Sequence, residues 1–540
     1  MILNGSQIFV EVLAEQGVDT IFGYPGGAVL NLYDELYKNS DRIRHILTAH
    51  EQGASHAADG YARATGRTGV VLATSGPGAT NLVTGIATAY MDSVPMVAFT
   101  GNVATSLLGR DSFQEAYIEG ITMPITKHNF TVRRVEDLAD TMRAAFRIAQ
   151  SGRKGPVLVD IPVDVQESML NRFEYPAAAH IVGYKPTTVG HAVQIKRALE
   201  ALGQAKRPVI CAGGGVFSAK ATELLRLFAE QIDAPVVTTM MGVGALEAGH
   251  PLRLGMLGTH GVRAANQALY AADLLVICGA RVGDRAVAKT GQVAENAVVI
   301  HIDVDPAEIG KNLKTAIPIV GDVGQVLAKM LELGQKLEHP AWCEQCTAWK
   351  TNGYGQDIKG FLNPYRFLEK LNGSMRPEGV IVADVGQNQI WSANTFGVPK
   401  GRFLTSGGMG TMGYSLPAAI GAKLADPSRE VVCVCGDGSF QMSMMELATL
   451  CQHNISVKIV IMKNMRLGMI RELQDEKYAH RHTAVFLDGS PDFMKLAEAY
   501  GISAACLREN DKAEAAIDEM LGHKGPYLLE CSVSPDQPSL

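Results

Sequence analysis

The chain has 540 residues, of which 47% are hydrophobic and 19% charged, so it is long enough for roughly three globular domains with large cores. A net charge of −6 gives no reason to expect nucleic acid or an anionic membrane as a partner. No apolar run approaches the ~20 residues of a membrane span, and the start of the chain lacks a signal-peptide pattern, so we expect a cytoplasmic protein.

The first third of the chain alternates between helical and strand patterns. We expect helices at residues 6–16, 30–38 and 52–65, and strands at residues 17–22, 43–47, 69–74, 95–100 and 155–162. Strands that alternate with helices in this way predict a doubly wound parallel sheet, which we assign to a first domain over residues 1–166.

Two further α/β units follow, separated by linkers predicted at about 167–190 and 335–362. The second domain, residues 190–334, has strand patterns at 208–212, 236–238, 274–278 and 298–302. The third, residues 363–534, has them at 380–383, 431–435 and 457–462. The predicted fold class is therefore α/β with three doubly wound parallel-sheet domains.

The nine cysteines are scattered, and several lie inside apolar strand patterns, which is typical of reduced thiols in a core. Cys343 and Cys346 form one CxxC pair with no second Cys or His pair nearby. We therefore favour a surface helix over a zinc site for these two residues.

The third domain carries the stretch around which the chain is organised. The strand at 431–435 runs into a Gly-Asp-Gly-Ser turn at 436–439, a helix is expected from about 440 to 451, and Asn464 follows the next strand. Ligands of βαβ units bind where the strands end, so Asp437 and Asn464 should lie at one edge of the sheet. Their oxygens suit Mg²⁺, and the helix start after Ser439 offers N–H groups to phosphates. A Gly-Asp-Gly tripeptide alone is as often only a turn.

Glu51 is the residue that we predict as the catalytic acid. It follows the strand predicted at 43–47, and Gly53 with other small residues would let a ring approach closely. A carboxylate at a strand end is more often simply solvated. Its context decides otherwise, because residues 50–63 (HEQGASHAADGYAR) and 73–81 (ATSGPGATN) match the N-terminal domain of thiamine-diphosphate (ThDP) enzymes.

Over nearly its whole length the sequence resembles one family of ThDP enzymes, the acetohydroxyacid synthases (acetolactate synthases). The Gly-Asp-Gly turn and Asn464, about twenty-five residues apart, resemble the family's diphosphate–Mg²⁺ signature. Further matching segments are 22–27 (FGYPGG), 113–115 (FQE), 256–261 (MLGTHG), 384–387 (DVGQ) and 407–413 (GGMGTMG). The three domains would then bind the ThDP pyrimidine, FAD and the ThDP diphosphate, in that order.

The resemblance implies a role for each matching residue. Glu51 would hydrogen-bond the aminopyrimidine ring of ThDP, with Gly27, Phe113 and Gln114 at the same catalytic site. Asp437, Asn464 and the backbone of Arg466 would bind Mg²⁺. Further ThDP contacts are implied for Pro77, Asn81, Gln387, Gly410, Met412, Gly436, Gly438, Ser439 and Met469.

The middle domain would hold FAD in a role without redox turnover. The implied contacts are Gly213, Gly214, Thr238, Gly258, His260, Gly261, Arg281, Asp303 and Asp322. A Rossmann-like domain that binds no flavin is the alternative, since a glycine-rich turn by itself is weak support. Arg285 would grip the carboxylate of the second 2-oxo acid, for which a guanidinium fork is well suited, and Leu473 would line the acceptor pocket.

The implied activity is decarboxylation of pyruvate and condensation of the hydroxyethyl carbanion with pyruvate or 2-oxobutanoate. The product would be 2-acetolactate or 2-aceto-2-hydroxybutanoate, in branched-chain amino acid biosynthesis. In the family the sheets that carry Glu51 and Asp437 meet across a subunit interface, which implies a homodimer or tetramer, and a separate regulatory small subunit is a further candidate partner.

Two alternatives stay open. The first is a ThDP-dependent decarboxylase, or an acetyltransferase, that acts on another 2-oxo acid or on sulfoacetaldehyde. The second is a catalytically silent assembly subunit, against which the joint presence of Glu51, Asp437 and Asn464 argues. The sequence departs from the family pattern at Val163 (usually Lys), Lys463 (usually Asn) and Leu473 (often Trp), and these departures put the acceptor preference in doubt.

Overall fold

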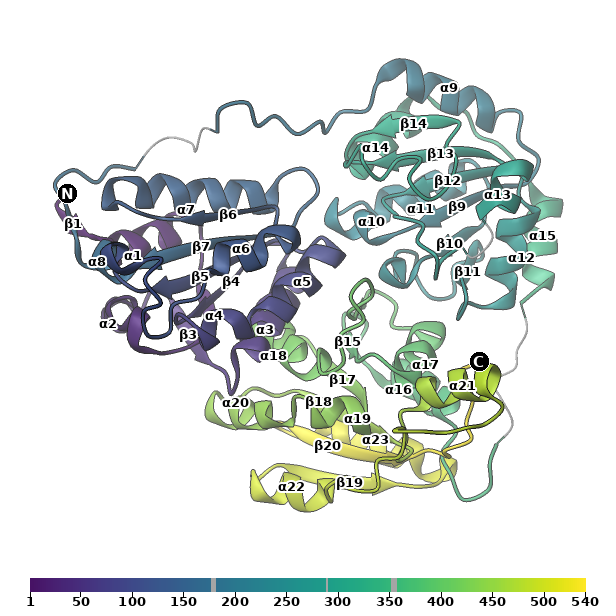
Figure 1. Cartoon of the computed structure of the whole chain (residues 1–540). Helices are drawn as coiled ribbons and strands as arrows, with labels where there is room; N and C mark the ends of the chain where they lie inside the picture. Colours follow the sequence, from purple (N-terminus) through teal and green to yellow (C-terminus); the bar gives the residue numbers. More distant parts are fainter. Residues whose placement is uncertain (176–180, 288–289, 351–356) are drawn as a thin grey trace.

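The computed structural model describes residues 1–175, 181–287, 290–350 and 357–540, which form three α/β units (Figure 1). Each unit contains a six-stranded sheet in which all neighbouring strands are parallel. The strand orders are β3-β2-β4-β5-β7-β6, β11-β10-β9-β12-β13-β14 and β16-β15-β17-β18-β20-β19. Strand order reverses inside each sheet, which is the doubly wound arrangement, and the predicted fold class is confirmed.

The first unit pairs its sheet with helices that begin close to the predicted positions. Its strands are β2 Thr20–Tyr24, β3 Arg44–Leu47, β4 Gly69–Ala73, β5 Met96–Asn102, β6 His128–Thr131 and β7 Pro156–Pro162. Its helices are α1 Gly5–Glu15, α2 Leu30–Lys38, α3 Glu51–Thr65, α4 Pro77–Asn81, α5 Val83–Asp92, α6 Ile118–Thr122, α7 Val135–Gln150 and α8 Val163–Glu167. A small antiparallel pair, β1 Leu3–Asn4 with β8 Met169–Leu170, closes this unit.

The second unit has shorter strands but the same layered construction. Its strands are β9 Pro208–Ala212, β10 Val236–Thr238, β11 Arg253–Met256, β12 Leu274–Cys278, β13 Val298–Asp303 and β14 Ile317–Val320. Its helices are α9 Ala192–Leu202, α10 Gly214–Ser218, α11 Thr222–Gln231, α12 Arg263–Ala271, α13 Thr290–Asn296, α14 Val323–Leu333 and α15 Pro340–Ala348.

The third unit contains the predicted organising stretch in its central strands. Its strands are β15 Val380–Ala383, β16 Arg402–Leu404, β17 Val431–Gly436, β18 Lys458–Lys463, β19 Ser503–Leu507 and β20 Tyr527–Ser532. Its helices are α16 Pro364–Ser374, α17 Gln387–Thr395, α18 Ser415–Ala425, α19 Asp437–Gln441, α20 Leu447–Gln452, α21 Gly468–Tyr478, α22 Phe493–Ala499 and α23 Ala513–Gly522.

Two local predictions were wrong. The helix expected over 440–451 is broken into α19, a 3₁₀ turn at Met444–Glu446 and α20, and the turn brings Glu446 against the start of α3. Glu51 does not lie at a strand end: β3 stops at Leu47, and Glu51 is the first residue of α3. The helix begins there because the His50 ring caps it, accepting a hydrogen bond from the Gln52 N–H.

The second predicted linker differs from expectation in the burial of its CxxC pair. Residues 176–180 of the first and 351–356 of the second lie outside the described residues. The described part of the second linker contains α15, which carries the CxxC pair, so a helix is present there as predicted. The prediction of a surface position was wrong for Cys346, which is fully buried against the second unit's core, whereas Cys343 is half-buried.

The first and third units are joined through helices α3 and α18, which lie against each other (Figure 1). A Cβ on Gly60 would lie 2.0 Å from the carbonyl oxygen of Ala418, and one on Gly421 would lie 1.8 Å from that of Ala57. The two backbones therefore touch, and only glycine fits at these two positions. Within the described ranges, no helix has both the length and the apolar character that a membrane span requires.

Candidate active site

Asp437 and Asn464 follow the ends of the adjacent parallel strands β17 and β18. Asp437 is 1% exposed, and its carboxylate accepts hydrogen bonds from the backbone N–H groups of Gly438 (3.1 Å) and Met465 (2.7 Å). Burial raises the pKa of Asp437 to about 6. In the described part of the chain no lysine or arginine forms an ion pair with Asp437. A bound cation would therefore supply the positive charge that a buried carboxylate needs as a partner. Carboxylate and amide oxygens are the donors that Mg²⁺ prefers.

A chain of hydrogen bonds holds Asn464 in place. Its Nδ2 donates to Gln387 Oε1 (2.9 Å), and Gln387 Nε2 in turn donates to Glu472 Oε1 (2.9 Å) and to the carbonyl of Gln537 (2.8 Å). Gln387 reaches this position because Gly468 has no side chain: a Cβ there would lie 1.8 Å from Gln387 Oε1. The Asn464 Oδ1 accepts from the Arg466 N–H (3.0 Å), so the Arg466 backbone lies beside the proposed metal ligands.

The turn after β17 is held by internal hydrogen bonds and lies beside the loop before α18. The Ser439 hydroxyl donates to the Gly436 carbonyl and accepts from its N–H, both at 3.1 Å. A Cβ on Gly438 would lie 3.8 Å from Met412 Cε, which places this loop beside the turn. Gly410 has a φ of +68°, a left-handed conformation that favours glycine. Met412 and Met469 are half-buried at this same edge.

Glu51 lies in a separate group of residues in the first unit. It is 9% exposed, and its Oε2 accepts a hydrogen bond from Asn81 Nδ2 (3.0 Å). A Cβ on Gly78 would lie 3.4 Å from its other oxygen, so the short helix α4, with Pro77 as its first residue, packs closely on the carboxylate. Burial and the nearby charge of Glu51 raise the pKa of the Tyr33 hydroxyl.

The three other predicted catalytic positions surround this group to different degrees. Gly27 opens a 3₁₀ turn, and a Cβ there would meet no atom within 4 Å, so the space beside it is open. Gln114 has a φ of +57° and contacts Gly76, whose Cβ would lie 2.9 Å from it. Phe113 is 87% exposed in the single chain. Gln114 thus reaches the turn before Pro77, whereas Phe113 faces solvent.

The Glu51 group and the Asp437–Asn464 group form two separate sets of contacts in the described residues. Among the described residues, no hydrogen bond or ion pair joins Glu51 to Asp437 or Asn464. The third unit instead reaches the other side of the Glu51 segment through Glu446, which is 1% exposed. Its carboxylate accepts from the N–H groups of Ala49 (3.1 Å) and His50 (3.2 Å). Sequence reasoning missed Glu446, since nothing in its local pattern shows that it contacts α3.

A cavity of about 740 Å³ lies where the three units meet. The second unit contributes six of the predicted residues to its wall: Gly214, His260, Arg281, Arg285, Asp303 and Asp322. Arg153 and Lys154 of the first unit and Arg402 of the third also line it, and sequence reasoning missed these cations. The volume falls within the range of small-molecule and cofactor sites. Burial raises the pKa of Asp303 to about 6.

Four residues predicted to contact FAD do not form the cavity wall: Gly213, Thr238, Gly258 and Gly261. They shape the backbone behind it. A Cβ on Gly213 would lie 2.3 Å from the Gly279 carbonyl, and Gly258 exchanges two hydrogen bonds with the Asn266 side chain (2.8 and 2.9 Å). At the three glycines among them a side chain would clash with a neighbouring backbone, because the turns approach each other closely.

The departures from the family pattern take distinct positions. Lys463 forms an ion pair with Glu530 (3.0 Å) and lies over the Phe493 ring, and its charge offsets part of the rise in the pKa of Asp437. Leu473 is half-buried on α21, and Val163 is the first residue of α8. Arg285 is 72% exposed in its side chain and lies 4.0 Å from its neighbour Asp284.

Comparison with known proteins places the chain in a family. Three family models match it, described as the N-terminal TPP binding domain (residues 3–121), the central domain (195–330) and the C-terminal TPP binding domain (384–531) of thiamine pyrophosphate enzymes. A relative named probable acetolactate synthase large subunit, from Methanocaldococcus jannaschii, is 47% identical over 99% of this chain and 92% of its own length. The chain belongs to the acetolactate synthase family of thiamine pyrophosphate enzymes.

Other members of the acetolactate synthase family are equally similar across the chain. The acetolactate synthase large subunit of Buchnera aphidicola subsp. Schizaphis graminum is 45% identical over 96% of this chain and 92% of its own length. The acetolactate synthase of Mycobacterium bovis is 46% identical over 99% and 88%. The resemblance found in the sequence is therefore confirmed at the level of the family.

Proposed function

We propose that this chain is the catalytic large subunit of an acetolactate synthase, which decarboxylates pyruvate and joins the two-carbon unit to a second 2-oxo acid. The observation that carries the proposal is the buried Asp437 beside Asn464 at adjacent strand ends, in a chain whose relatives have this name. Pyruvate and 2-oxobutanoate are the proposed acceptors, and branched-chain amino acid biosynthesis is the proposed pathway.

The residues divide the work in a way that the geometry supports. Asp437, Asn464 and the Arg466 backbone would hold Mg²⁺, and through it the diphosphate, beside the N–H groups of the turn after β17. Glu51, oriented by Asn81, would exchange a proton with the cofactor's pyrimidine ring. When bound, ThDP supplies the stabilised carbanion for decarboxylation and carbon–carbon bond formation, while the protein binds and orients it.

The 740 Å³ cavity is the proposed FAD site. Its Asp303 and Asp322 side chains could accept hydrogen bonds from ribose hydroxyls, and Arg281, Arg153 and Lys154 could balance phosphate charge. A test that does not depend on activity is the absorption spectrum of the purified protein after dialysis against FAD. Arg281→Ala should weaken FAD retention, whereas unchanged retention would contradict this assignment.

A homodimer is the proposed minimal active unit, because the Glu51 and Asp437 groups are not joined within one chain. Mixing and refolding Glu51→Gln chains with Asp437→Ala chains tests this. If one site takes Glu51 from one chain and Asp437 from the other, mixed dimers contain one intact site, and about a quarter of the parent activity should return. No recovery in demonstrably mixed dimers would contradict the shared site.

A decisive assay for the proposed function measures CO₂ release and product identity from pyruvate with ThDP and Mg²⁺ present. The proposal expects 2-acetolactate in amounts equal to the CO₂ released. Acetaldehyde as the only product would favour a simple decarboxylase, and activity only with sulfoacetaldehyde would favour the acetyltransferase alternative. Because relatives are named large subunits, co-purification with a small regulatory subunit is a further expectation. The nine free cysteines agree with the cytoplasm as the predicted location.

A further inference from the structure

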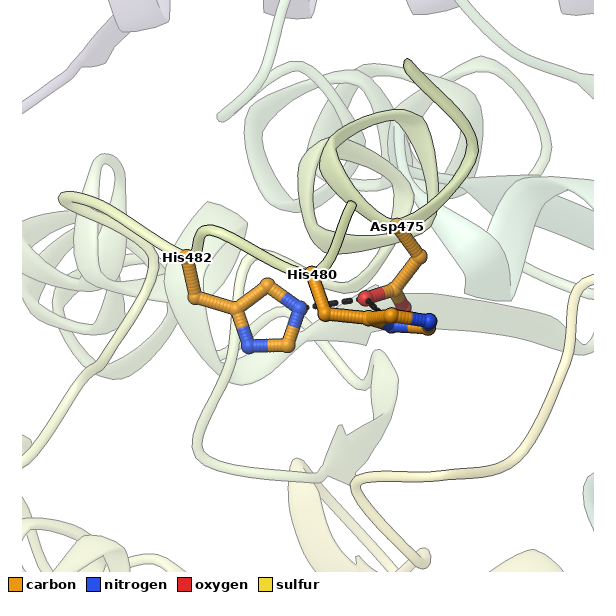
Figure 2. Close-up of side chains that lie close together, drawn as sticks. All are labelled: Asp475, His480 and His482. Carbon is orange, nitrogen blue, oxygen red and sulfur yellow. Dashed lines mark hydrogen bonds and ion pairs between the residues drawn. The ribbon is translucent and has the colours of Figure 1, made fainter. Parts of the chain in front are cut away.

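A cluster of two histidines and one carboxylate lies at the C-terminal end of helix α21 (Figure 2). His480 Nδ1 lies 2.7 Å, and His482 Nε2 2.5 Å, from the same carboxylate oxygen, Oδ1 of Asp475. The candidate ligand atoms of the three residues all lie within 4.8 Å of one another.

The backbone around the cluster is arranged so that both rings face the helix. Helix α21 ends at Tyr478, and the next two residues, Ala479 and His480, have φ values of +51° and +60°. These left-handed residues turn the chain back over the helix end. Gln474 then fastens the returning segment to the helix, because its side chain exchanges hydrogen bonds with the backbone of Thr483 (3.0 and 3.1 Å).

We propose that Asp475, His480 and His482 form a binding site for a divalent transition-metal ion, with Zn²⁺ as the best fit. Imidazole nitrogens and a carboxylate oxygen are the ligands of open three-residue zinc sites, which keep a fourth position for water. Zinc–ligand bonds of about 2.0–2.1 Å place tetrahedral ligand atoms roughly 3.3 Å apart. The two nitrogens therefore need to move less than about 1 Å away from Asp475 Oδ1 to admit the ion.

The surroundings agree with an open site of this kind. The His480 side chain is 78% exposed, so its ring is free to adjust and water can reach the fourth position. Arg471 lies 3.8 Å from the second oxygen of Asp475 and also pairs with Asp536 (3.1 Å). At this distance it attracts the second oxygen electrostatically and leaves Oδ1 to the histidines. Its positive charge opposes a cation, so we expect a reversible site.

Nitrogen ligands separate this site chemically from the one at Asp437. Mg²⁺ binds oxygen ligands and gains little from imidazole, whereas first-row transition metals favour it. Excess Mg²⁺ should therefore leave the cluster free for Zn²⁺ or Co²⁺. An ion bound there would link residues 480 and 482 to the helix that carries Met469 and Leu473, and would restrain the segment between them.

The test is a titration of the full-length protein, saturated with ThDP and Mg²⁺, with Co²⁺, whose visible absorption reports tetrahedral coordination. The parent and a matched control, His191→Ala at an exposed histidine of the second unit, should bind one more Co²⁺ than the cluster variants, and Zn²⁺ should displace it. His480→Ala and His482→Ala should weaken this binding at least roughly tenfold. Since His480 is exposed, its variant tests the site without disturbing the fold.

A second readout is trypsin cleavage after the exposed residues Lys477 and Arg481. Zn²⁺ should slow cleavage there in the parent and in His191→Ala but not in His480→Ala. Absence of a tetrahedral Co²⁺ signal in the parent, or a signal of equal strength in His480→Ala and His482→Ala, would overturn the proposal. Both measurements are independent of acetolactate formation, so the site and the proposed catalytic function can fail separately.

Discussion

Replacement of Glu446 should loosen the segment that presents Glu51. The Glu446 carboxylate accepts three hydrogen bonds, from the N–H groups of Ala49 and His50 and from the Thr449 hydroxyl (2.6 Å). Glu446→Ala leaves two backbone donors without an acceptor, and each such loss costs about 1–3 kcal/mol. Allowing for water that enters the space, we expect a loss of about 3 kcal/mol in local stability, which corresponds to roughly a hundredfold faster amide exchange.

Hydrogen exchange measured by mass spectrometry on a peptide covering residues 49–54 is the direct assay. Glu446→Gln keeps the side-chain volume and one acceptor oxygen, so its effect should be intermediate. Thr449→Val is the matched control, because it removes the third hydrogen bond and leaves both backbone contacts intact. Exchange in Glu446→Ala within about threefold of the parent, or equal to that of Thr449→Val, would refute the reasoning.

Three further predictions concern catalysis, pH and specificity. Glu51→Gln should retain ThDP binding but lose activity by about 10²–10⁴-fold; steady-state rates within about threefold of the parent would exclude the proton-transfer role. Burial raises the pKa of Asp160 from 3.8 to about 7, so its contribution to stability is present below pH ~4 and is lost as the pH rises through 7. The melting temperature of Asp160→Asn, relative to the parent, should therefore increase from pH 5 to pH 8, and a constant difference would contradict the shift. Leu473→Trp should raise the preference for 2-oxobutanoate over pyruvate by roughly tenfold in a competition assay, since one methylene in an apolar pocket is worth about 1–3 kcal/mol; an unchanged ratio would show that other residues form the pocket.

The third unit shows which features of the fold and site can be predicted from local sequence patterns. Apolar strand runs and the polar residues after them are local features, and adjacent parallel strands bring their carboxyl ends together. This is why the positions of Asp437 and Asn464 could be predicted at one edge of the sheet. The hydrogen bonds from Gln387 through Glu472 could not, because they join segments that are distant in sequence.

The errors have the same physical origin. The periodicity of residues 440–451 is helical, but a contact between Glu446 and the first unit favours a 3₁₀ turn in the middle of that segment. Arg153 and Lys154 line the cavity where the three units meet, although nothing in their own sequence context indicates a ligand. Tertiary contacts between units decide both features, and such contacts leave no periodic signal in one chain segment.

The backbone contact between α3 and α18 has a consequence for recombination among relatives. Gly60 packs on the carbonyl of Ala418 and Gly421 on that of Ala57, and every residue has such a carbonyl, so no side-chain change on the facing helix makes room for a larger residue at either glycine. A chimera that joins residues 1–166 of one family member to the remainder of another should therefore tolerate sequence differences across the cavity more readily than the loss of glycine at either of these two positions. Glycine in both parents at the positions of Gly60 and Gly421 is then the condition for a well-packed hybrid.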